Sequence, residues 1–323
     1  MNAFSSSARG SSALPVPATA PRERALVLGG GGSTGNAWLI GVVAGLFEAG
    51  LDVSSADLTV GTSAGSTAAA QLACATPAEL YEATLAAVPP ARPARPAGGP
   101  ARPAGGTGGA RSQTASVIDF LDRTDRIIAA SSDAADMRRR LGAAALELEA
   151  ESDADWSRRW RSIVAARFPG ADWPERAVRI TAMDARTGEP VVFDRGSGVA
   201  LVDAVAASCS SGLPYAIGEG RYLDGGYRTN AENADLAAGY ERVLVLSPFG
   251  GRTRTPFDWG LHLATQVDDL RARGSRVETV FPEPSAEHLF GPNAMDFTLR
   301  PAAARAGHAQ ARSLAPTLTP FWT

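Results

Sequence analysis

The chain has 323 residues, of which 45% are hydrophobic and 20% are charged, and its formal net charge is −3. This length allows one large α/β domain or two small ones with a sizeable core, and the composition is that of an ordinary soluble globular protein. The slightly acidic balance argues against nucleic-acid binding through a strong basic field. Cys74, Cys209 and the three histidines have no metal-ligand spacing, so we expect no metal site and no cofactor.

Residues 1–22 are rich in serine, alanine and proline, which predicts a disordered N-terminal segment ahead of one domain over residues 23–323. The segment lacks the apolar run of about 7–15 residues that a secretory signal needs. No stretch of the chain approaches the roughly 20 apolar residues of a membrane span. We therefore expect a cytoplasmic protein, with peripheral contact to a membrane left open.

The first regular elements are predicted to form a βαβ unit. Residues 25–28 are a short apolar run typical of a buried parallel strand. A glycine-rich segment follows, and residues 37–47 then show helical periodicity, with Gly50 placed to end that helix. Residues 58–60 predict the next strand. A strand, a glycine loop, a helix and a second strand imply parallel pairing and a right-handed crossover.

The second strand leads into Gly61-Thr62-Ser63-Ala64-Gly65, which matches the G-x-S-x-G pattern of a nucleophile elbow. A serine on a sharp strand-to-helix turn has a crowded backbone, so glycine is needed two residues before it and two after. The N-terminus of the following helix adds partial positive charge where an oxyanion would form. The position between strand and helix favours Ser63 as a nucleophile, and a tight turn without chemical meaning is the alternative.

The glycine-rich segment has two interpretations. Gly30, Gly32 and Gly35 satisfy the G-x-G-x-x-G pattern of dinucleotide-binding proteins. That pattern requires an acidic residue at the end of the second strand, where this chain has Ser63 instead. The other interpretation is a loop whose backbone amides face an anion. If the first two strands are neighbours, those amides can hold an oxyanion developing beside Ser63.

The middle of the chain is predicted to be helical around an insertion. Helices are expected at residues 65–75 and 77–88. Residues 89–114 repeat proline, alanine, arginine and glycine, which predicts a disordered insertion, because such a composition cannot offset its ordering entropy. Residues 116–168 have a helical pattern, which fits helices packed on a sheet or a cap over an apolar acyl pocket.

The rest of the chain alternates strands and helices, which is typical of a three-layer α/β/α sandwich with a mostly parallel central sheet. Strands are predicted at residues 177–183, 190–193, 242–246 and 276–281, and helices at residues 199–207, 259–270 and 302–314. A short apolar segment at residues 221–223 ends in Asp224-Gly225-Gly226. The two glycines would let another loop approach this carboxylate closely.

A nucleophilic serine needs a general base. Histidine is the usual one, so a triad of Ser63, Asp224 and one of His262, His288 and His308 stays open. None of these histidines follows a strand in a glycine-rich loop, where a catalytic histidine would be expected. The other option is Asp224 itself, provided that burial or nearby charge raises its pKa toward the working pH. A simple Asp-Gly turn is the alternative without chemistry.

Taken together, these motifs resemble those of the patatin-like phospholipases, from about residue 24 to residue 248. The family's oxyanion motif corresponds to Gly30-Gly31-Gly32-Ser33-Thr34-Gly35, its nucleophile motif to Gly61–Gly65, and its D-G-G/A motif to Asp224-Gly225-Gly226. The family's A-S-x-x-x-P block resembles Ala207-Ser208 with Pro214, at a longer spacing, and Asn230 stands where an asparagine often follows D-G-G. The family usually has arginine or lysine at the position of Thr34, so a positive charge is missing there.

The resemblance implies an α/β acyl hydrolase that cleaves lipid acyl esters, as a phospholipase, lysophospholipase or lipid esterase. It implies a Ser63–Asp224 dyad without a catalytic histidine, with oxyanion donors in residues 30–35 and supporting glycines at Gly61, Gly65, Gly225 and Gly226. Two other hypotheses stay open: a non-catalytic lipid-binding relative with the same fold, and a dinucleotide-binding oxidoreductase.

Overall fold

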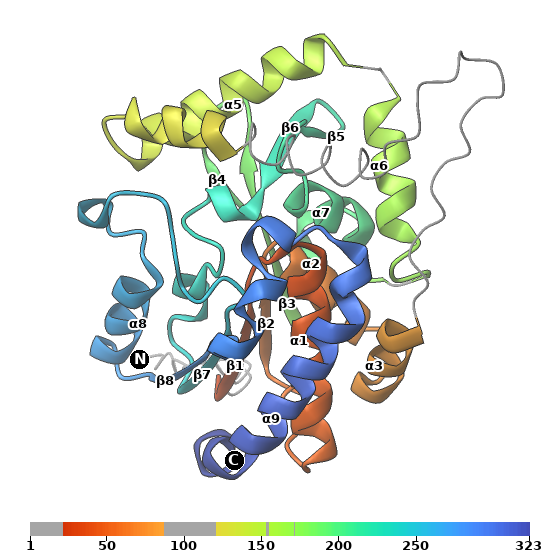
Figure 1. Cartoon of the computed structure of the whole chain (residues 1–323). Coiled ribbons are helices and arrows are strands. Elements are labelled where there is room, and N and C mark those ends of the chain that lie inside the picture. Colours follow the sequence, from red (N-terminus) through yellow and green to blue (C-terminus); the bar gives the residue numbers. More distant parts are fainter. Residues whose placement is uncertain (1–21, 87–120, 153–154, 171) are drawn as a thin grey trace, which may run out of the picture.

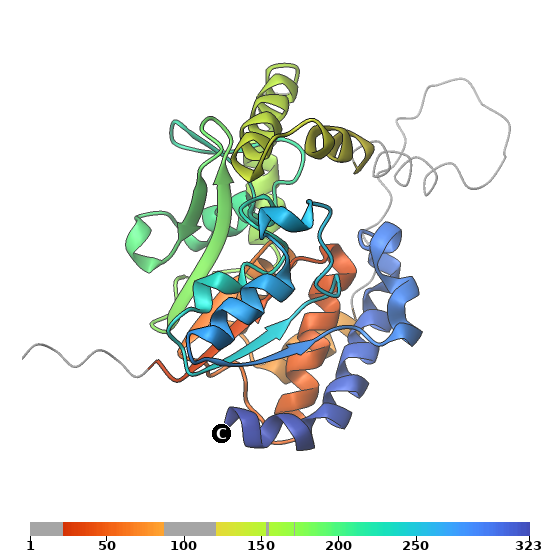
Figure 2. The same cartoon turned by 90° about the vertical axis from the view of Figure 1, so that its left-hand side faces the viewer.

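The computed structural model describes residues 22–86, 121–152, 155–170 and 172–323. The segment expected to be disordered at residues 1–22 lies outside the described residues except for Arg22, and so does the insertion expected at residues 89–114. A central sheet has helices on both faces, which confirms the predicted layered α/β architecture (Figures 1 and 2).

The sheet has eight strands, and seven of them follow the order β5-β6-β3-β2-β1-β7-β8, with β4 paired to β3. The strands are β1 (Arg24–Leu28), β2 (Leu58–Gly61), β3 (Ala177–Asp184), β4 (Pro190–Phe193), β5 (Tyr215–Ile217), β6 (Gly220–Asp224), β7 (Arg242–Leu246) and β8 (Arg276–Val280). Pairing is parallel from β3 through β2, β1 and β7 to β8. The pairs of β3 with β4, β3 with β6 and β5 with β6 are antiparallel, so the sheet is mostly parallel as predicted.

The order of the strands brings the predicted motifs to one edge of the sheet. Strands β1 and β2 are neighbours, and Leu28 pairs with Gly61, so the glycine loop and the serine turn leave the sheet side by side. Strand β3 separates β2 from β6, with Ile180 opposite Gly61 and Ala182 opposite Asp224. Asp224, at the end of β6, therefore lies close to the edge of the sheet at which β2 ends.

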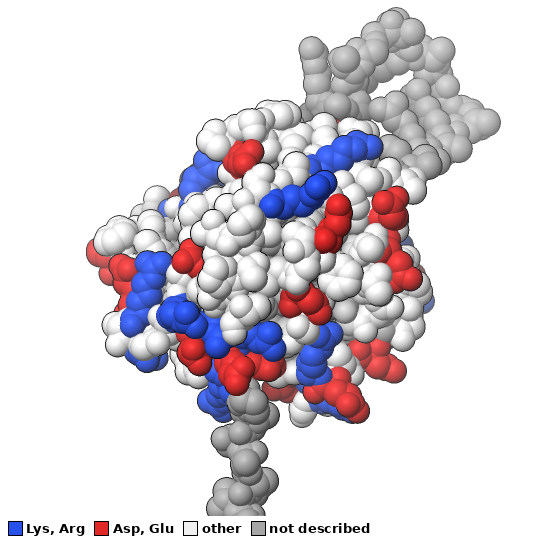
Figure 3. Space-filling view, turned by 90° about the horizontal axis from the view of Figure 1, so that it is seen from below, with Lys and Arg blue, Asp and Glu red and all other residues white. Residues whose placement is uncertain are grey.

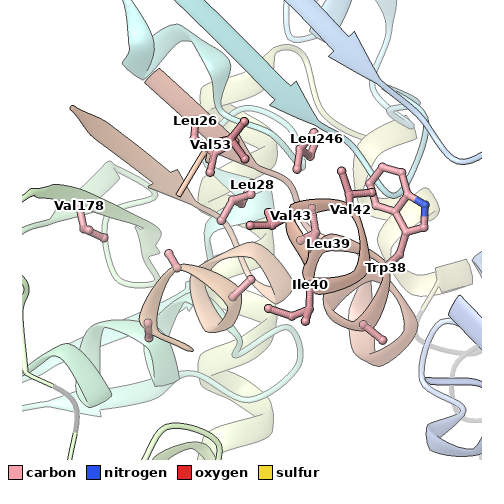
Figure 4. Packing of buried hydrophobic residues seen from close by; sticks show 14 of the residues in the cluster. Leu26, Leu28, Trp38, Leu39, Ile40, Val42, Val43, Val53, Val178 and Leu246 are labelled. Atoms are coloured by element: carbon pink, nitrogen blue, oxygen red, sulfur yellow. The ribbon is translucent and has the colours of Figure 1, made fainter. Parts of the chain in front are cut away.

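Alternating side chains of β1 serve the two faces of the sheet. Leu26 and Leu28 pack into the larger core, formed mainly with helices α1 (Gly32–Glu48), α2 (Ala64–Leu72), α7 (Leu201–Ser208) and α9 (Arg300–Trp322). Figure 4 shows Leu28, Leu39 and Val43 converging from strand and helix in this layer. Ala25 and Val27 point the other way, toward α8 (Leu263–Ala272). Burial on both faces explains the continuous apolar run of this strand.

Helix α1 begins at Gly32, five residues before the start that periodicity predicts. The first turn consists of glycine, serine and threonine, so it has no apolar stripe that could reveal a helix. Almost the whole helix is buried, because α9 covers the side that faces away from the sheet. The N-terminal amides of α1 thus lie at the same edge as Ser63.

A second helical group covers the antiparallel end of the sheet (Figure 1). It includes α5 (Ala134–Ala150) and α6 (Trp156–Ala165), as expected from the helical pattern of residues 116–168. Helix α3 (Pro77–Ala86) packs on α1 instead. Under α5 a small apolar cluster joins Met137 and Leu141 to Met183 and Leu223. This cluster anchors α5 beside the strand that ends in Asp224.

Besides α1, two elements differ from the sequence-based prediction. The three-residue strand β5 was not predicted, because so short a segment has no readable period. Helix α9 continues to Trp322 through Pro316 and Pro320, although proline normally interrupts a helix. Its buried residues Ala315, Leu318 and Trp322 keep the last turns on the core, and the Arg242 guanidinium bonds the Trp322 carbonyl at 2.8 Å.

The surface seen from below mixes arginines with carboxylates, and the described residues on that face form no basic field of one sign (Figure 3). Among the helices of the described ranges, none combines the length and the apolar character needed to cross a bilayer.

Candidate active site

Ser63 occupies a strained turn between β2 and α2. Its backbone has φ 52° and ψ −113°, which is the left-handed side of conformational space, rarely adopted by residues other than glycine. Its amide donates to the Ser208 hydroxyl at 2.9 Å, and its carbonyl accepts from the Ser66 hydroxyl at 2.6 Å and the Cys209 thiol at 3.2 Å. Such strain at a single serine is typical of a functional site.

The glycines around Ser63 are required by close backbone contacts. A Cβ atom at Gly65 would overlap the Leu28 carbonyl, and one at Gly61 would lie 2.7 Å from the Ser66 Cα. Gly225 is equally constrained, because its Cβ would overlap Thr181. At Gly226 a Cβ would lie 3.2 Å from Oδ1 of the preceding aspartate, so that site is tight but less restrictive.

Asp224 is the last residue of β6 and is only 8% exposed. Its Oδ1 accepts a hydrogen bond from the Gly226 amide at 2.8 Å. Burial raises the pKa of the carboxyl to about 6, against the lowering effect of the Gly226 amide and of a hydrogen bond with the Ser63 side chain. The structure therefore brings the side chains of Ser63 and Asp224, which are far apart in the sequence, close together.

The glycine loop lies beside Ser63, since a Cβ atom at Gly30 would be 3.6 Å from that of the serine. Not all of its amides face a free space. Gly30 donates to the Ala231 carbonyl at 2.8 Å, Thr34 to Ala294 at 3.0 Å and Gly35 to Gly31 at 3.0 Å. The predicted set of six oxyanion donors is thus too large.

Within the described residues, the amides of Gly31, Gly32 and Ser33 have no hydrogen-bond acceptor. They form the N-terminus of α1, where the first amides of a helix lack intrahelical partners and carry partial positive charge. Gly32 has φ +66°, and a Cβ there would lie 2.7 Å from the Ala294 carbonyl, so only glycine fits. These three amides are therefore the candidates within this loop for binding an anion.

Asn233 connects the Ser63 turn with the loop that follows Asp224. It was not recognised from the sequence. It is completely buried in a left-handed conformation, with φ 57°. Its side-chain amide donates to Thr62 Oγ1 at 3.0 Å and to the Gly225 carbonyl at 2.9 Å. Asn230, noted in the sequence, contributes indirectly: its Oδ1 accepts the amide of Asn233 at 2.7 Å. An Asn-x-x-Asn spacing after D-G-G was the only signal available.

Glu232, also unrecognised in the sequence, is fully buried behind the glycine loop. Its Oε1 accepts the Ser247 hydroxyl at 2.6 Å, whereas Oε2 has no partner among the described residues. A Cβ atom at Gly29 would lie 3.4 Å from the Glu232 Cγ, so the carboxyl side chain packs directly on the start of the loop. Burial raises the pKa of Glu232 to about 7.

The three histidines have partners away from the serine. His262 bonds the Thr255 carbonyl at 3.0 Å, His288 bonds the Ser285 carbonyl at 3.0 Å, and His308 bonds Glu48 at 2.7 Å. Neither Ser63 nor Asp224 is among these partners. The arrangement offers a carboxylate to the serine in the place where a triad would have an imidazole.

Two further features bear on ligands. In the described ranges, no group of three or more His, Cys, Asp and Glu side chains could hold a metal ion. A narrow, mainly apolar crevice lies between α5 and the end of β6, and neither Ser63 nor Asp224 is among its lining residues. Its lining includes Leu141, Ala145, Leu148, Leu223 and Tyr227.

No curated protein matches the chain. Two solved structures are similar at low identity: VipD from Legionella pneumophila, at 13% identity and a TM-score of 0.39, and the type III effector protein ExoU, at 15% identity and a TM-score of 0.30. The matches cover 92% and 91% of this chain, but 67% and 54% of those proteins.

A family model gives the stronger result. The model of the patatin-like phospholipases matches residues 26–237, which is more than half of the chain. The matched range contains the glycine loop, the Ser63 turn and Asp224, and it ends before β7, β8, α8 and α9. The chain therefore belongs to the patatin-like phospholipase family.

Proposed function

We propose that the protein is a serine acyl hydrolase that cleaves acyl esters of lipids with Ser63 as nucleophile and Asp224 as general base. The observation that carries this proposal is that a strained serine lies close to a buried carboxyl whose pKa is raised to about 6. A carboxyl with that pKa is ionised at neutral pH and yet more basic than an ordinary aspartate, as proton abstraction requires.

In the acylation step, Asp224 takes the hydroxyl proton of Ser63 as the oxygen attacks the ester carbonyl. The tetrahedral oxyanion is held by the amides of Gly31, Gly32 and Ser33, supported by the dipole of α1. The protonated Asp224 then gives its proton to the leaving alcohol. Water activated by the same carboxylate attacks the acyl-enzyme and releases the fatty acid.

One structural feature supports a lipid substrate. The crevice between α5 and the end of β6 is lined mainly by apolar side chains, among them Leu141, Leu148 and Leu223, which suits an acyl chain. It is narrow in this conformation, so entry of a long chain requires α5 to move away from the sheet. Such a role for the 116–168 segment is the cap function that its helical pattern allows.

The test is hydrolysis of a nitrophenyl ester by the wild type, Ser63→Ala, Asp224→Asn and a variant in which all three histidines are replaced. We expect the first two variants to lose activity and the histidine-free protein to keep most of it. Labelling by a fluorophosphonate separates an enzyme from a non-catalytic lipid-binding relative, because only an activated serine reacts. An inactive histidine-free protein beside an active Asp224→Asn variant would refute the dyad.

A further inference from the structure

Glu232 is a buried carboxyl that the dyad mechanism does not use. Its side chain is completely buried, and its Oε2 atom has no hydrogen-bond partner among the described residues. A buried polar oxygen without a partner costs stability, because the hydrogen bonds to water that it lost on folding are not replaced. Such costly groups are found mainly at functional sites, so the contacts of this carboxyl bear on the chemistry beside it.

One wall of the glycine loop is the end of β7. The Leu246 carbonyl accepts the Gly29 amide at 2.9 Å. Pro248 packs so closely that a Cβ atom at Gly31 would lie 2.6 Å from the Pro248 Cβ, and one at Gly35 would lie 3.1 Å from it. Because Gly31 carries the first free amide of the loop, the position of Pro248 affects where the oxyanion donors point.

The other wall of the loop is the segment that follows Asp224. The Ala231 carbonyl accepts the Gly30 amide at 2.8 Å. A Cβ atom at Gly29 would lie 3.4 Å from the Glu232 Cγ, so the glutamate side chain packs on the start of the loop. The first residues of the loop are therefore enclosed between this segment and the end of β7.

The carboxyl of Glu232 joins the two walls. Its Oε1 accepts the Ser247 hydroxyl at 2.6 Å, and Ser247 directly precedes Pro248. The oxygen of the same hydroxyl accepts the Gly251 amide at 2.8 Å, which fixes the turn after β7. A hydrogen bond in a dry interior is electrostatically stronger than one in water. The bond between Glu232 and Ser247 thus acts as a clamp that closes the two walls around the loop.

A turn at residues 230–233 relates this clamp to the dyad. Oδ1 of Asn230 accepts the amides of Glu232 and Asn233 at 3.0 Å and 2.7 Å. The side chain of Asn233 donates to the residue before the nucleophile and to the residue after the base. One turn therefore fixes the nucleophile, the base and the oxyanion loop relative to one another, and Glu232 is its side-chain contact to the loop.

We propose that Glu232 is a positioning residue, whose carboxyl clamps the turn after β7 onto the oxyanion loop and so holds the free amides of residues 31–33 where the oxyanion forms. The proposal rests on the acyl hydrolase function proposed above. Preorganised donors lower the barrier because they need no rearrangement as charge develops, and a displacement of about 1 Å costs roughly 100-fold in rate. The oxyanion exists only in the transition state, so the clamp should raise kcat and leave KM nearly unchanged.

The experiment measures kcat and KM for a nitrophenyl ester in Glu232→Ala and Ser247→Ala. Each variant opens the clamp from one side, so kcat should fall about 10-fold to 100-fold while KM changes by less than about threefold. Glu232→Gln keeps an oxygen for the Ser247 hydroxyl and should recover most of the rate. The double variant with both alanines should lose no more than either single variant, since both changes remove the same hydrogen bond.

Ser275→Ala is the matched control. Ser275 is also a buried serine, and its hydroxyl donates to the Tyr240 carbonyl at 2.6 Å. It precedes β8, at the opposite edge of the sheet from the glycine loop, so this variant should lose stability and keep the wild-type kcat. An alkyl trifluoromethyl ketone, which forms a tetrahedral oxyanion adduct on Ser63, reports on the oxyanion donors directly. Its inhibition constant should rise in Glu232→Ala by the same factor as kcat/KM falls.

The outcomes separate the clamp from the hydrolase. A kcat within about twofold of the wild type in both Glu232→Ala and Ser247→Ala would overturn the positioning role and leave the hydrolase intact. The same conclusion follows if Ser275→Ala lowers kcat as much as Ser247→Ala, because the loss would then come from general destabilisation. If Glu232→Ala does not fold, Ser247→Ala and the ketone inhibitor decide by themselves. Absence of Ser63-dependent hydrolysis in the wild type would instead overturn the hydrolase itself.

Discussion

Replacing Asp224 by asparagine should make the protein more stable and less active at the same time. The carboxyl is buried, and its pKa is about 6 compared with an ordinary value of 3.8. A shift of about 2 units corresponds to on the order of 3 kcal/mol of unfavourable free energy for the ionised, buried form. Asparagine has nearly the same shape, still accepts the Gly226 amide through its oxygen, and carries no charge to desolvate.

The sign of the pH dependence follows from the raised pKa. Between pH 4 and pH 6 the folded protein binds the proton of Asp224 more tightly than the unfolded chain does, so stability falls as pH rises through this window. Below about pH 4 both states are protonated and the penalty is absent. The free energy of unfolding of Asp224→Asn should therefore match that of the wild type near pH 4 and exceed it by up to about 3 kcal/mol at pH 8.

The assay is urea unfolding of Asp224→Asn and the wild type at each pH, with esterase rates on the same preparations. The wild-type kcat/KM should fall tenfold per pH unit below about pH 6, because only the ionised carboxyl is a base. The variant should lose about 100-fold to 10,000-fold in rate. A variant that is destabilised equally at pH 4 and pH 8 would refute the reasoning, because the carboxyl would then contribute shape or hydrogen bonds rather than a buried charge.

Three further predictions concern neighbouring residues. Ser63→Gly should be about 1 kcal/mol more stable than Ser63→Ala in thermal unfolding, since glycine adopts φ 52° without strain; equal stabilities would show that the turn is unstrained. Asn233→Ala should lower the free energy of unfolding in urea by about 2–4 kcal/mol and should also lower kcat, because Thr62 and Gly225 lose their shared donor. Asn293→Ala, at an exposed position, serves as the control. The wild type should lose stability on the order of 3 kcal/mol between about pH 4.5 and pH 7, where the Glu232 carboxyl ionises, and Glu232→Gln should remove this loss. A stability difference between the two proteins that does not change with pH in urea titrations would contradict the raised pKa.

Much of the fold and the centre of the candidate site could be predicted from the sequence, because their signals are local. The apolar run of β1 reflects burial on both faces, and the G-x-S-x-G segment reflects backbone crowding within five residues. Asp224 stood out because two glycines follow a short apolar segment. In each case the physical cause lies within a few residues of the signal.

The tertiary structure decided everything that depends on distant partners. Three of the six loop amides are occupied, and two of their acceptors, Ala231 and Ala294, come from other parts of the chain. Asn233 and Glu232 reach the site from a segment without a recognisable motif.

The sequence by itself determined which residues are candidates for catalysis, namely Ser63, Asp224 and the glycine loop, since residue type and local backbone pattern can be read from adjacent positions. Only the tertiary structure decided which amides of the glycine loop are free and how far burial raises the pKa of the Asp224 carboxyl. The physical reason is that desolvation and hydrogen-bond occupancy are set by groups that are close in space, and for Asp224 these include a serine 161 positions away in the chain.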